Sequence, residues 1–359
     1  MADKLRVKKR NRPKREDLQI RADEITEEIL QEALLSEKPS GRRADKKTVI
    51  AVICIIAVIF TAIICLNEAV CHLDFIPTWN ELYEGAGLSG SVYGDIADGE
   101  TAVHFIDVGQ GDCELIDAGG SYVLIDSGEY SEVSSVTGYL NNLGVSRLEY
   151  IVISHPHSDH MGSMAKIVDS FEVGSVIMAD MEENMLPATS SYVKLIEAID
   201  RKNIPIIFPE AGDTVPLTDG WLEILAPVES YDDLNNYSLV VKYIHGDNSF
   251  LFTGDIEEKA ERDILESGLD VSAEVIKVAH HGSDSSSCKV FMQSVAPDYG
   301  VIEVGDSNDY GHPHREPMEL FEKLGIEIYR TDMQGDIVFV SDGKDYRIIT
   351  SEDKSFIGE

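Results

Sequence analysis

The segment YIVISHPHSDHMG, from Tyr150 to Gly162, gives the strongest indication of this chain's structure and chemistry. It starts as an apolar run typical of a buried β-strand, and it continues into a short segment that holds four metal-binding side chains. Imidazole and carboxylate groups suit a divalent first-row metal such as zinc or manganese. The spacing favours one or two ions and places the ligands in two pairs, which are His155 with His157 and Asp159 with His160.

Strands alternate with helices along the chain from residue 101, which indicates a layered α/β architecture. We expect helices at Glu132–Leu143, Ser191–Lys202, Glu257–Glu266 and Glu316–Leu324. We expect strands at Thr101–Asp107, Ser121–Asp126, Glu149–Ser154, Ile204–Phe208, Trp221–Ala226, Ser238–His245, Ser249–Thr253, Glu274–Ala279, Tyr299–Glu303, Glu327–Arg330, Asp336–Val340 and Tyr346–Thr350.

The pattern His-x-His-x-Asp-His at the end of a strand resembles the signature of the metallo-β-lactamase-fold superfamily. This resemblance covers about Thr101–Thr350 and implies an αββα sandwich, in which helices flank two sheets and the metals lie at one sheet edge. It also implies that Asp126, which ends an early strand, supports the histidine segment. Asp255, which follows the strand that ends at Thr253, would then bridge both metals, since its two oxygens can bind two cations.

The neighbouring histidines His280 and His281 follow another apolar segment, and the resemblance assigns the last metal ligand to this pair. We favour His280 as the ligand, with His281 contacting substrate or supporting the other ligands. The superfamily's third histidine on the first metal is absent from residues 231–237. Three interpretations stay open for this site: Asn236 or Asp233 completes it, it binds its metal more weakly, or it is empty.

Further motifs narrow the resemblance to the hydrolase domain of ComEC-type competence proteins. They are His104–Asp112, Asn236–Val241, Leu251–Asp255, Ala279–Ser283, and Tyr310–His314 followed by Tyr329–Asp332. The resemblance is to the hydrolase domain alone, without the multi-helix channel of those proteins. His312 lies in a loop that glycine and proline flank, before an expected helix, and is a candidate proton donor or phosphate contact. The other expected supports or substrate contacts are Gln110, Asp112, Asn236, Ser283 and His314.

Charge and hydropathy divide the chain into a basic head and an acidic body. Residues 1–47 hold 14 Lys or Arg and 10 Asp or Glu, whereas the remaining residues hold 16 and 55. Thr48–Leu66 contains 19 uncharged residues, close to the roughly 20 that a helix needs to cross a bilayer. Because Lys and Arg precede this segment, we expect a single-pass cell-membrane anchor after a cytoplasmic tail. Residues 67–100 then form a linker, and residues 101–359 form an extracellular hydrolase domain.

These patterns predict a hydrolase in which metal-activated water attacks phosphorus or a carbonyl carbon near Asp159 and Asp255. The ComEC resemblance favours a phosphodiesterase or nuclease. The formal net charge of −35 disfavours long DNA, because polyanion binding needs Lys and Arg. A local basic strip of Lys277, Lys289, Arg315 and Arg330 is one way to offset that charge. Two alternatives remain: a phosphorylcholine-esterase-like enzyme acting on cell-wall or small phosphodiesters, and a non-catalytic metal-binding surface module.

Overall fold

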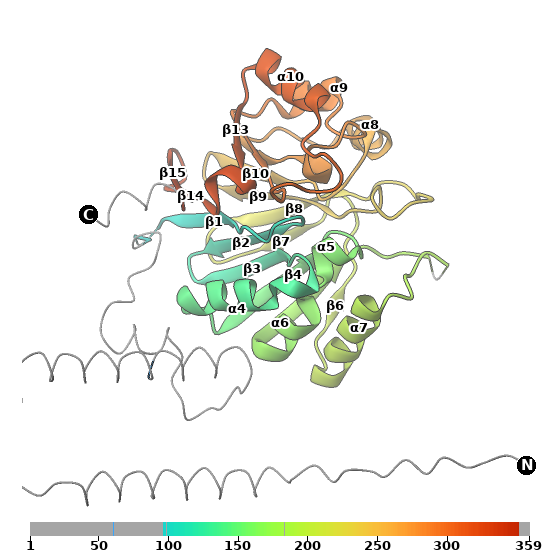
Figure 1. Cartoon of the computed structure of the whole chain (residues 1–359), viewed down its shortest axis with the longest axis vertical. Coiled ribbons are helices and arrows are strands. Elements are labelled where there is room, and N and C mark those ends of the chain that lie inside the picture. Colours follow the sequence, from blue (N-terminus) through green and yellow to red (C-terminus); the bar gives the residue numbers. More distant parts are fainter. Residues whose placement is uncertain (1–59, 61–95, 98, 183, 352–359) are drawn as a thin grey trace, which may run out of the picture. The chain divides into compact units, whose positions relative to one another are not determined.

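The computed structural model describes residues 60, 96–97, 99–182 and 184–351 (Figure 1). Apart from Phe60, the predicted cytoplasmic tail (1–47) and membrane anchor (48–66) lie outside these residues, as does most of the predicted linker. In the described part of the chain, no helix is both long and apolar enough to cross a bilayer.

The strands form two mixed β-sheets. The first sheet has the order β15 (Tyr346–Thr350), β14 (Ile337–Ser341), β1 (Thr101–Phe105), β2 (Cys113–Ala118), β3 (Ser121–Asp126), β4 (Arg147–Ile153), β5 (Glu172–Met178) and β6 (Ile206–Ile207). The second has the order β13 (Glu327–Arg330), β12 (Tyr299–Ile302), β11 (Val275–Lys277), β10 (Asn248–Phe252), β9 (Val240–His245), β8 (Trp221–Ala226) and β7 (Thr214–Pro216). Each sheet therefore contains both parallel and antiparallel neighbours.

Helices cover the outer faces of both sheets, which confirms the predicted αββα sandwich (Figure 1). The first sheet is covered by α4 (Val133–Asn142), α6 (Met164–Ser170) and α7 (Ser190–Lys202). The second is covered by α8 (Glu258–Ser267), α9 (Lys289–Val295) and α10 (Arg315–Leu324). The described residues also contain four short helical turns, which are η2 (Tyr130–Glu132), α5 (Ser158–Met161), η3 (Ala279–Gly282) and α11 (Thr331–Gln334).

Aromatic side chains fill the space between the two sheets. The ring of Phe105 in β1 lies 6.0 Å from that of Phe252 in β10, and Phe250 and Phe339 are also 6.0 Å apart. All four are essentially inaccessible to solvent. Burying each one stabilises the fold by about 1.5–3 kcal/mol, and this core locks the sheets against each other.

The carboxyl ends of two parallel strand pairs lie at one edge of the sandwich. In the first sheet, β3 pairs with β4 in parallel, and these strands end at Asp126 and Ile153. In the second sheet, β10 pairs with β11 in parallel, and these strands end at Phe252 and Lys277. The segments that leave β4, β10 and β11 carry the predicted metal ligands, and β3 ends at Asp126, their predicted support, so the topology gathers these residues at a single place.

Candidate metal centre

The turn after β4 is shaped by close backbone contacts that only glycine permits. The backbone N–H of Asp112 donates to the Asp159 carbonyl at 3.1 Å. A Cβ atom on Gly111 would lie 2.3 Å from that carbonyl oxygen, and one on Gly162 would lie 2.4 Å from the Ser158 carbonyl oxygen. Neither position can accept a side chain without moving the ligand segment, which explains the glycines on both sides of it.

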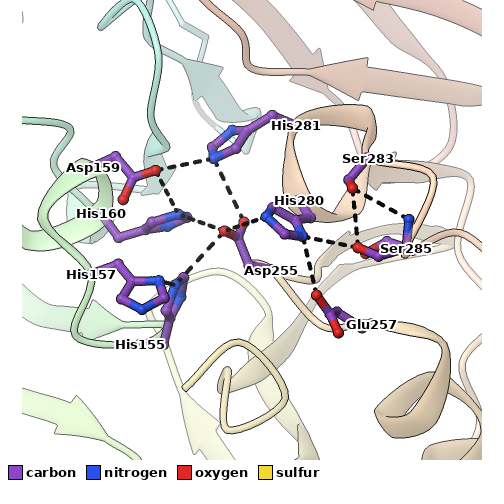
Figure 2. A network of polar contacts seen from close by, with 12 residues as sticks. His155, His157, Asp159, His160, Asp255, Glu257, His280, His281, Ser283 and Ser285 are labelled. Atoms are coloured by element: carbon purple, nitrogen blue, oxygen red, sulfur yellow. Dashed lines mark hydrogen bonds and ion pairs between the residues drawn. The ribbon is translucent and has the colours of Figure 1, made fainter. Parts of the chain in front are cut away.

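The predicted ligands form two clusters that share Asp255 (Figure 2). The first cluster contains His155, His157 and Asp255, and the second contains Asp159, His160, Asp255 and His281. Within each cluster the potential ligand atoms all lie within 4.8 Å of one another.

The spacing between ligand atoms suits a small cation. His160 Nε2 lies 3.3 Å from Asp255 Oδ2, and His281 Nε2 lies 3.5 Å from Asp159 Oδ2. Ligands that bind zinc tetrahedrally at about 2.1 Å are about 3.4 Å apart, so the second cluster has the dimensions of a zinc-sized site. In the first cluster, His155 Nε2 and His157 Nδ1 are 2.9 Å apart.

Buried atoms without hydrogen-bond partners show that the residues fit a metal. Among the described residues, these include His160 Nε2, His281 Nε2 and Asp255 Oδ1, all of which belong to the second cluster. A buried polar atom without a partner is costly, and a bound cation removes that cost. The donor set of imidazole and carboxylate is also the set that divalent zinc or manganese accepts.

Hydrogen bonds to the remaining ring nitrogens orient the histidines. His160 Nδ1 lies 2.8 Å from Asp126 Oδ2, and His281 Nδ1 donates to the Glu303 carbonyl at 2.9 Å. Each contact puts the proton on Nδ1 and leaves the Nε2 lone pair for a metal. Asp126 thus lies where a support for the histidine segment was expected.

The charges of the ligands are mixed when no metal is bound. Burial lowers the pKa of His160 and of His281, but the surrounding carboxylates, Asp255 first, outweigh it and raise both pKa values, so a metal bound at Nε2 would displace a proton. Burial lowers the pKa of His155 and of His280, so both imidazoles are neutral at pH 7. Burial raises the pKa of Asp255, but the neighbouring His160 and His281 outweigh it and hold that pKa well below its usual value. Neutral imidazoles and an ionised carboxylate are the metal-binding forms of these groups.

The structure places His281, rather than the favoured His280, in the second cluster. The two residues adopt left-handed backbone angles, with φ of 52° and 54°, and their side chains diverge. His281 is buried in the second cluster, whereas His280 is partly exposed and its Nδ1 lies 3.2 Å from Ser285 Oγ. Its Nε2 still lies 3.8 Å from Asp255 Oδ2, at the edge of the centre (Figure 2).

Neither residue proposed to replace the missing histidine lies in the first cluster. The amide of Asn236 donates to the carboxylate of Asp233, and its oxygen accepts from the backbone N–H groups of Glu257 and Ala260 at the start of α8. Asn236 therefore caps this helix. Ser238, which the sequence analysis did not single out, has its hydroxyl 3.3 Å from His155 Nδ1.

Other predicted contacts line or surround a cleft of about 550 Å³ over the two clusters. Gln110 and His312 line it, and Gln110 also accepts from the backbone N–H of Gly305 at 3.2 Å. His314 lies outside the lining, and its Nδ1 accepts from the backbone N–H of Asp284 at 3.0 Å. The hydroxyl of Ser283 lies 3.0 Å from that of Ser285, which in turn contacts His280.

A buried ion pair lies behind the centre, where a surface cation was expected. Lys277 is fully buried and pairs with the carboxylate of Asp112. The same carboxylate lies 3.2 Å from His281 Nδ1. Arg330 pairs with Asp332, so neither cation is free to bind a polyanion. Lys277 and Arg330 therefore do not contribute to the predicted basic strip.

Comparison with known proteins agrees with this geometry. Residues 106–306 match the Metallo-beta-lactamase superfamily. ComE operon protein 3 of Bacillus subtilis is 28% identical over 67% of this chain and 33% of its own length. Competence protein ComA of Neisseria gonorrhoeae is 28% identical over 68% of this chain and 33% of its own. Recombination protein 2 of Haemophilus influenzae is 28% identical over 66% of this chain and 28% of its own length.

This chain thus spans about a third of the length of these curated relatives, and the aligned part includes a ComEC-type hydrolase domain. The matched residues 106–306 contain both ligand clusters and the residues that orient them. The chain belongs to the metallo-beta-lactamase superfamily.

Proposed function

We propose that this protein is an extracytoplasmic, membrane-anchored phosphodiesterase that depends on divalent metal, with nucleic acid as its substrate class. The observation that carries the proposal is the pair of clusters that share Asp255 beneath one cleft. Two metals about 3.5–4 Å apart can stabilise both the attacking and the leaving oxygen in an in-line displacement at phosphorus. A single carboxylate common to both clusters suits that separation.

Different side chains of the cleft would have different roles in such a reaction. Bound divalent metal would lower the pKa of water to about 7 and so supply hydroxide. Asp159 and Asp255 would be among the ligands that hold this metal. Burial, together with the neighbouring His281 and His280, lowers the pKa of His312 to about 4. A neutral His312 is suited to donate a hydrogen bond to a phosphate oxygen, rather than to act as a charged acid.

The names of the relatives favour nucleic acid over other phosphodiesters. Two of them are called a competence protein and a recombination protein, and each aligns with about two thirds of this chain. The proposal extends that connection to this chain.

The experiment compares substrates on the purified full-length chain in detergent, loaded with Mn²⁺ or Zn²⁺. Single-stranded DNA, double-stranded DNA and a small chromogenic phosphodiester are each incubated with the protein and with its His157→Ala variant. Metal-dependent cleavage of DNA that the variant lacks is the expected result. Absence of all turnover, with metal present in the protein by elemental analysis, would contradict the proposal and favour a metal-binding surface module.

A second candidate is a phosphorylcholine-esterase-like hydrolase of cell-wall or small phosphodiesters. The acidic balance of 65 Asp and Glu against 30 Lys and Arg favours it, because a long polyanion would be repelled. Burial of Lys277 removes a further cation from the surface. Cleavage of the chromogenic diester without cleavage of DNA would select this candidate.

The membrane anchor is the second part of the proposal, and it rests on the 19 uncharged residues Thr48–Leu66 and the basic residues before them. We expect the full chain to stay in the membrane fraction after a carbonate wash. External protease should remove the hydrolase domain from intact cells. Release by carbonate, or protection from protease, would contradict the proposed topology.

A further inference from the structure

A second hollow adjoins the metal cleft on the side of the first sheet's helices. This α6–α7 pocket has a volume of about 470 Å³, and its lining includes Tyr130, Ser158, Lys166, Lys194 and Arg201. Ser158 also lines the metal cleft and stands between two predicted ligands in the sequence, His157 and Asp159. A polymeric substrate that leaves the cleft over Ser158 would therefore enter this pocket.

Two unpaired cations line the pocket in a body that has few of them. Lys166 and Lys194 are exposed, and no described carboxylate forms an ion pair with either. Many other cations are neutralised: for example, Arg262 pairs with Glu258 and Arg347 pairs with Glu100. The two free lysines can therefore bind an anion without first breaking an ion pair.

The pocket also presents an aromatic face. Tyr130 is 57% exposed, and the ammonium of Lys194 lies 5.7 Å from the centroid of its ring. An exposed aromatic ring beside cations is the combination that binds single-stranded nucleic acid, because bases stack on the ring while phosphates contact the cations. In a duplex the bases are already stacked, so this ring would have no base to receive.

Three carboxylates temper the positive charge of the pocket. Asp169 pairs with Arg201, and Glu129 accepts a hydrogen bond from the hydroxyl of Ser158 at 2.9 Å. Glu197 is the third. The lining is thus balanced, with three cations and three carboxylates, whereas the whole chain has 30 against 65. Because the lining carries no net charge while the chain as a whole is strongly acidic, a polyanion is repelled less at this pocket than over the rest of the protein.

We propose that the α6–α7 pocket binds the strand of a single-stranded nucleic acid next to the phosphodiester held at the metal centre, with phosphates at Lys166 and Lys194 and a base on Tyr130. This inference rests on the proposed function and names the form of its substrate. A pocket outside the cleft would bind a nucleic-acid strand but not a small diester. It would therefore make the enzyme prefer a polymeric substrate.

The first test measures binding without turnover. Affinity for a labelled single-stranded oligonucleotide is measured by fluorescence anisotropy on the full chain in detergent, with EDTA present to stop metal-dependent cleavage. Lys166→Glu/Lys194→Glu should raise the Kd about tenfold or more. It should also reduce the slope of log K against log salt by about 1.4, since each single-strand phosphate contact contributes about 0.7. The matched control Lys259→Glu/Lys344→Glu makes the same charge change at exposed sites outside the pocket. Its Kd should stay within about twofold of the wild type.

The second test asks whether a base is recognised. Tyr130→Ala should weaken binding about tenfold, whereas Tyr130→Phe, which keeps the ring, should bind as the wild type does. A glycerol-phosphate polymer, which has phosphates but no bases, should compete poorly. Equal weakening by the pocket and control lysine pairs would overturn the proposal. Strong competition by the polymer together with no effect of Tyr130→Ala would assign the pocket to a wall polymer instead.

The outcome for the pocket can be separated from that for the catalytic proposal. If the metal-loaded wild type cleaves neither DNA nor the small diester, the proposed function fails, yet the EDTA binding data still decide the pocket. If both are cleaved, the pocket lysine pair should lower kcat/KM for the oligonucleotide about tenfold relative to that for the diester. An unchanged ratio would remove the pocket from substrate selection.

Discussion

Lys277 and Asp112 form an ion pair in which both side chains are shielded from solvent, directly behind the second ligand cluster. The other oxygen of Asp112 faces His281 Nδ1 at 3.2 Å. Glu114 and Glu303 lie in the same buried group of carboxyl groups. Burial and the charge of Asp112 raise the pKa of Glu303 to about 8, so this carboxyl group is mostly protonated at pH 7. Lys277 thus balances the charge of a carboxylate that helps to orient a metal ligand.

Removing the Lys277 charge should destabilise the protein and weaken its metal site. Lys277→Met keeps the length of the side chain but leaves Asp112 buried without its cation, which costs about 3–5 kcal/mol. Urea unfolding measures this loss, and elemental analysis measures bound metal. Lys242→Met is a matched control, because Lys242 is also buried in the second sheet but its partner Asp270 is exposed. It should cost about 1 kcal/mol. Equal losses of stability in both variants would show that Lys277 is not required to stabilise the buried charge of Asp112.

The two neighbouring histidines should differ in their effect on metal binding. His281→Ala removes a ligand of the second cluster and should lower metal affinity about 100-fold or more, because even residues that only orient ligands contribute 10–100-fold. His280→Ala should leave that affinity nearly unchanged and reduce turnover. Competition with a chromogenic chelator measures the affinity of each variant. A larger loss of affinity for His280→Ala would restore the assignment drawn from the sequence.

Much of the fold is readable from the sequence where hydrophobic periodicity is uninterrupted. The predicted strands Ser121–Asp126 and Trp221–Ala226 have the bounds of β3 and β8. β5 was not among the predicted strands, because Gly174 breaks its apolar run. That glycine is needed because a Cβ atom there would lie 2.4 Å from the Glu149 carbonyl oxygen. The contact with Glu149 in the neighbouring strand thus requires a glycine that interrupts the local hydrophobic pattern of β5.

The site was readable as a set of residues but not as a geometry. The segment around His155 predicts a cluster because its ligands are close in sequence. The choice between His280 and His281 depends on two left-handed backbone angles that no spacing encodes. Lys277 follows an apolar strand, and only its pairing with the distant Asp112 explains why a lysine is tolerated there. Local patterns therefore identified the chemistry, while tertiary contacts assigned the roles.

Neutralising Asp126 should weaken the metal site without unfolding the domain. Asp126 has φ of 52°, a left-handed conformation that asparagine tolerates, so Asp126→Asn changes charge and hydrogen bonding but not the backbone. The amide cannot satisfy both Ser154 N–H and His160 Nδ1–H as the carboxylate does. We expect metal affinity to fall about 10–100-fold. Asp117→Asn, on the neighbouring β2, is the control and should bind metal normally. Unchanged affinity in Asp126→Asn would mean that His160 is oriented without this carboxylate.

Glu261 should make the stability of the metal-free protein depend on pH. This side chain is buried at α8, away from the ligands, and accepts the backbone N–H of Cys288 at 2.8 Å. Burial raises its pKa to about 7 from 4.5. Between these values the folded protein keeps a proton that the unfolded chain releases, so the free energy of unfolding falls as pH rises from about 4.5 to about 7. The full loss is about 3 kcal/mol, at 1.36 kcal/mol for each pH unit.

The variant Glu261→Gln cannot titrate and isolates this contribution. Urea unfolding of both proteins in EDTA, at about pH 5 and about pH 8, gives the difference in stability between the two conditions. The wild type should lose about 2.5 kcal/mol more than Glu261→Gln over this range, because every other titrating group is common to both and the unfolded chain has already released most of this proton at pH 5. The lost hydrogen bond lowers the variant's stability equally at both pH values and cancels from the comparison. The same pH dependence in both proteins would show that Glu261 is ionised in the folded state throughout, with its backbone donors stabilising the charge more than burial disfavours it.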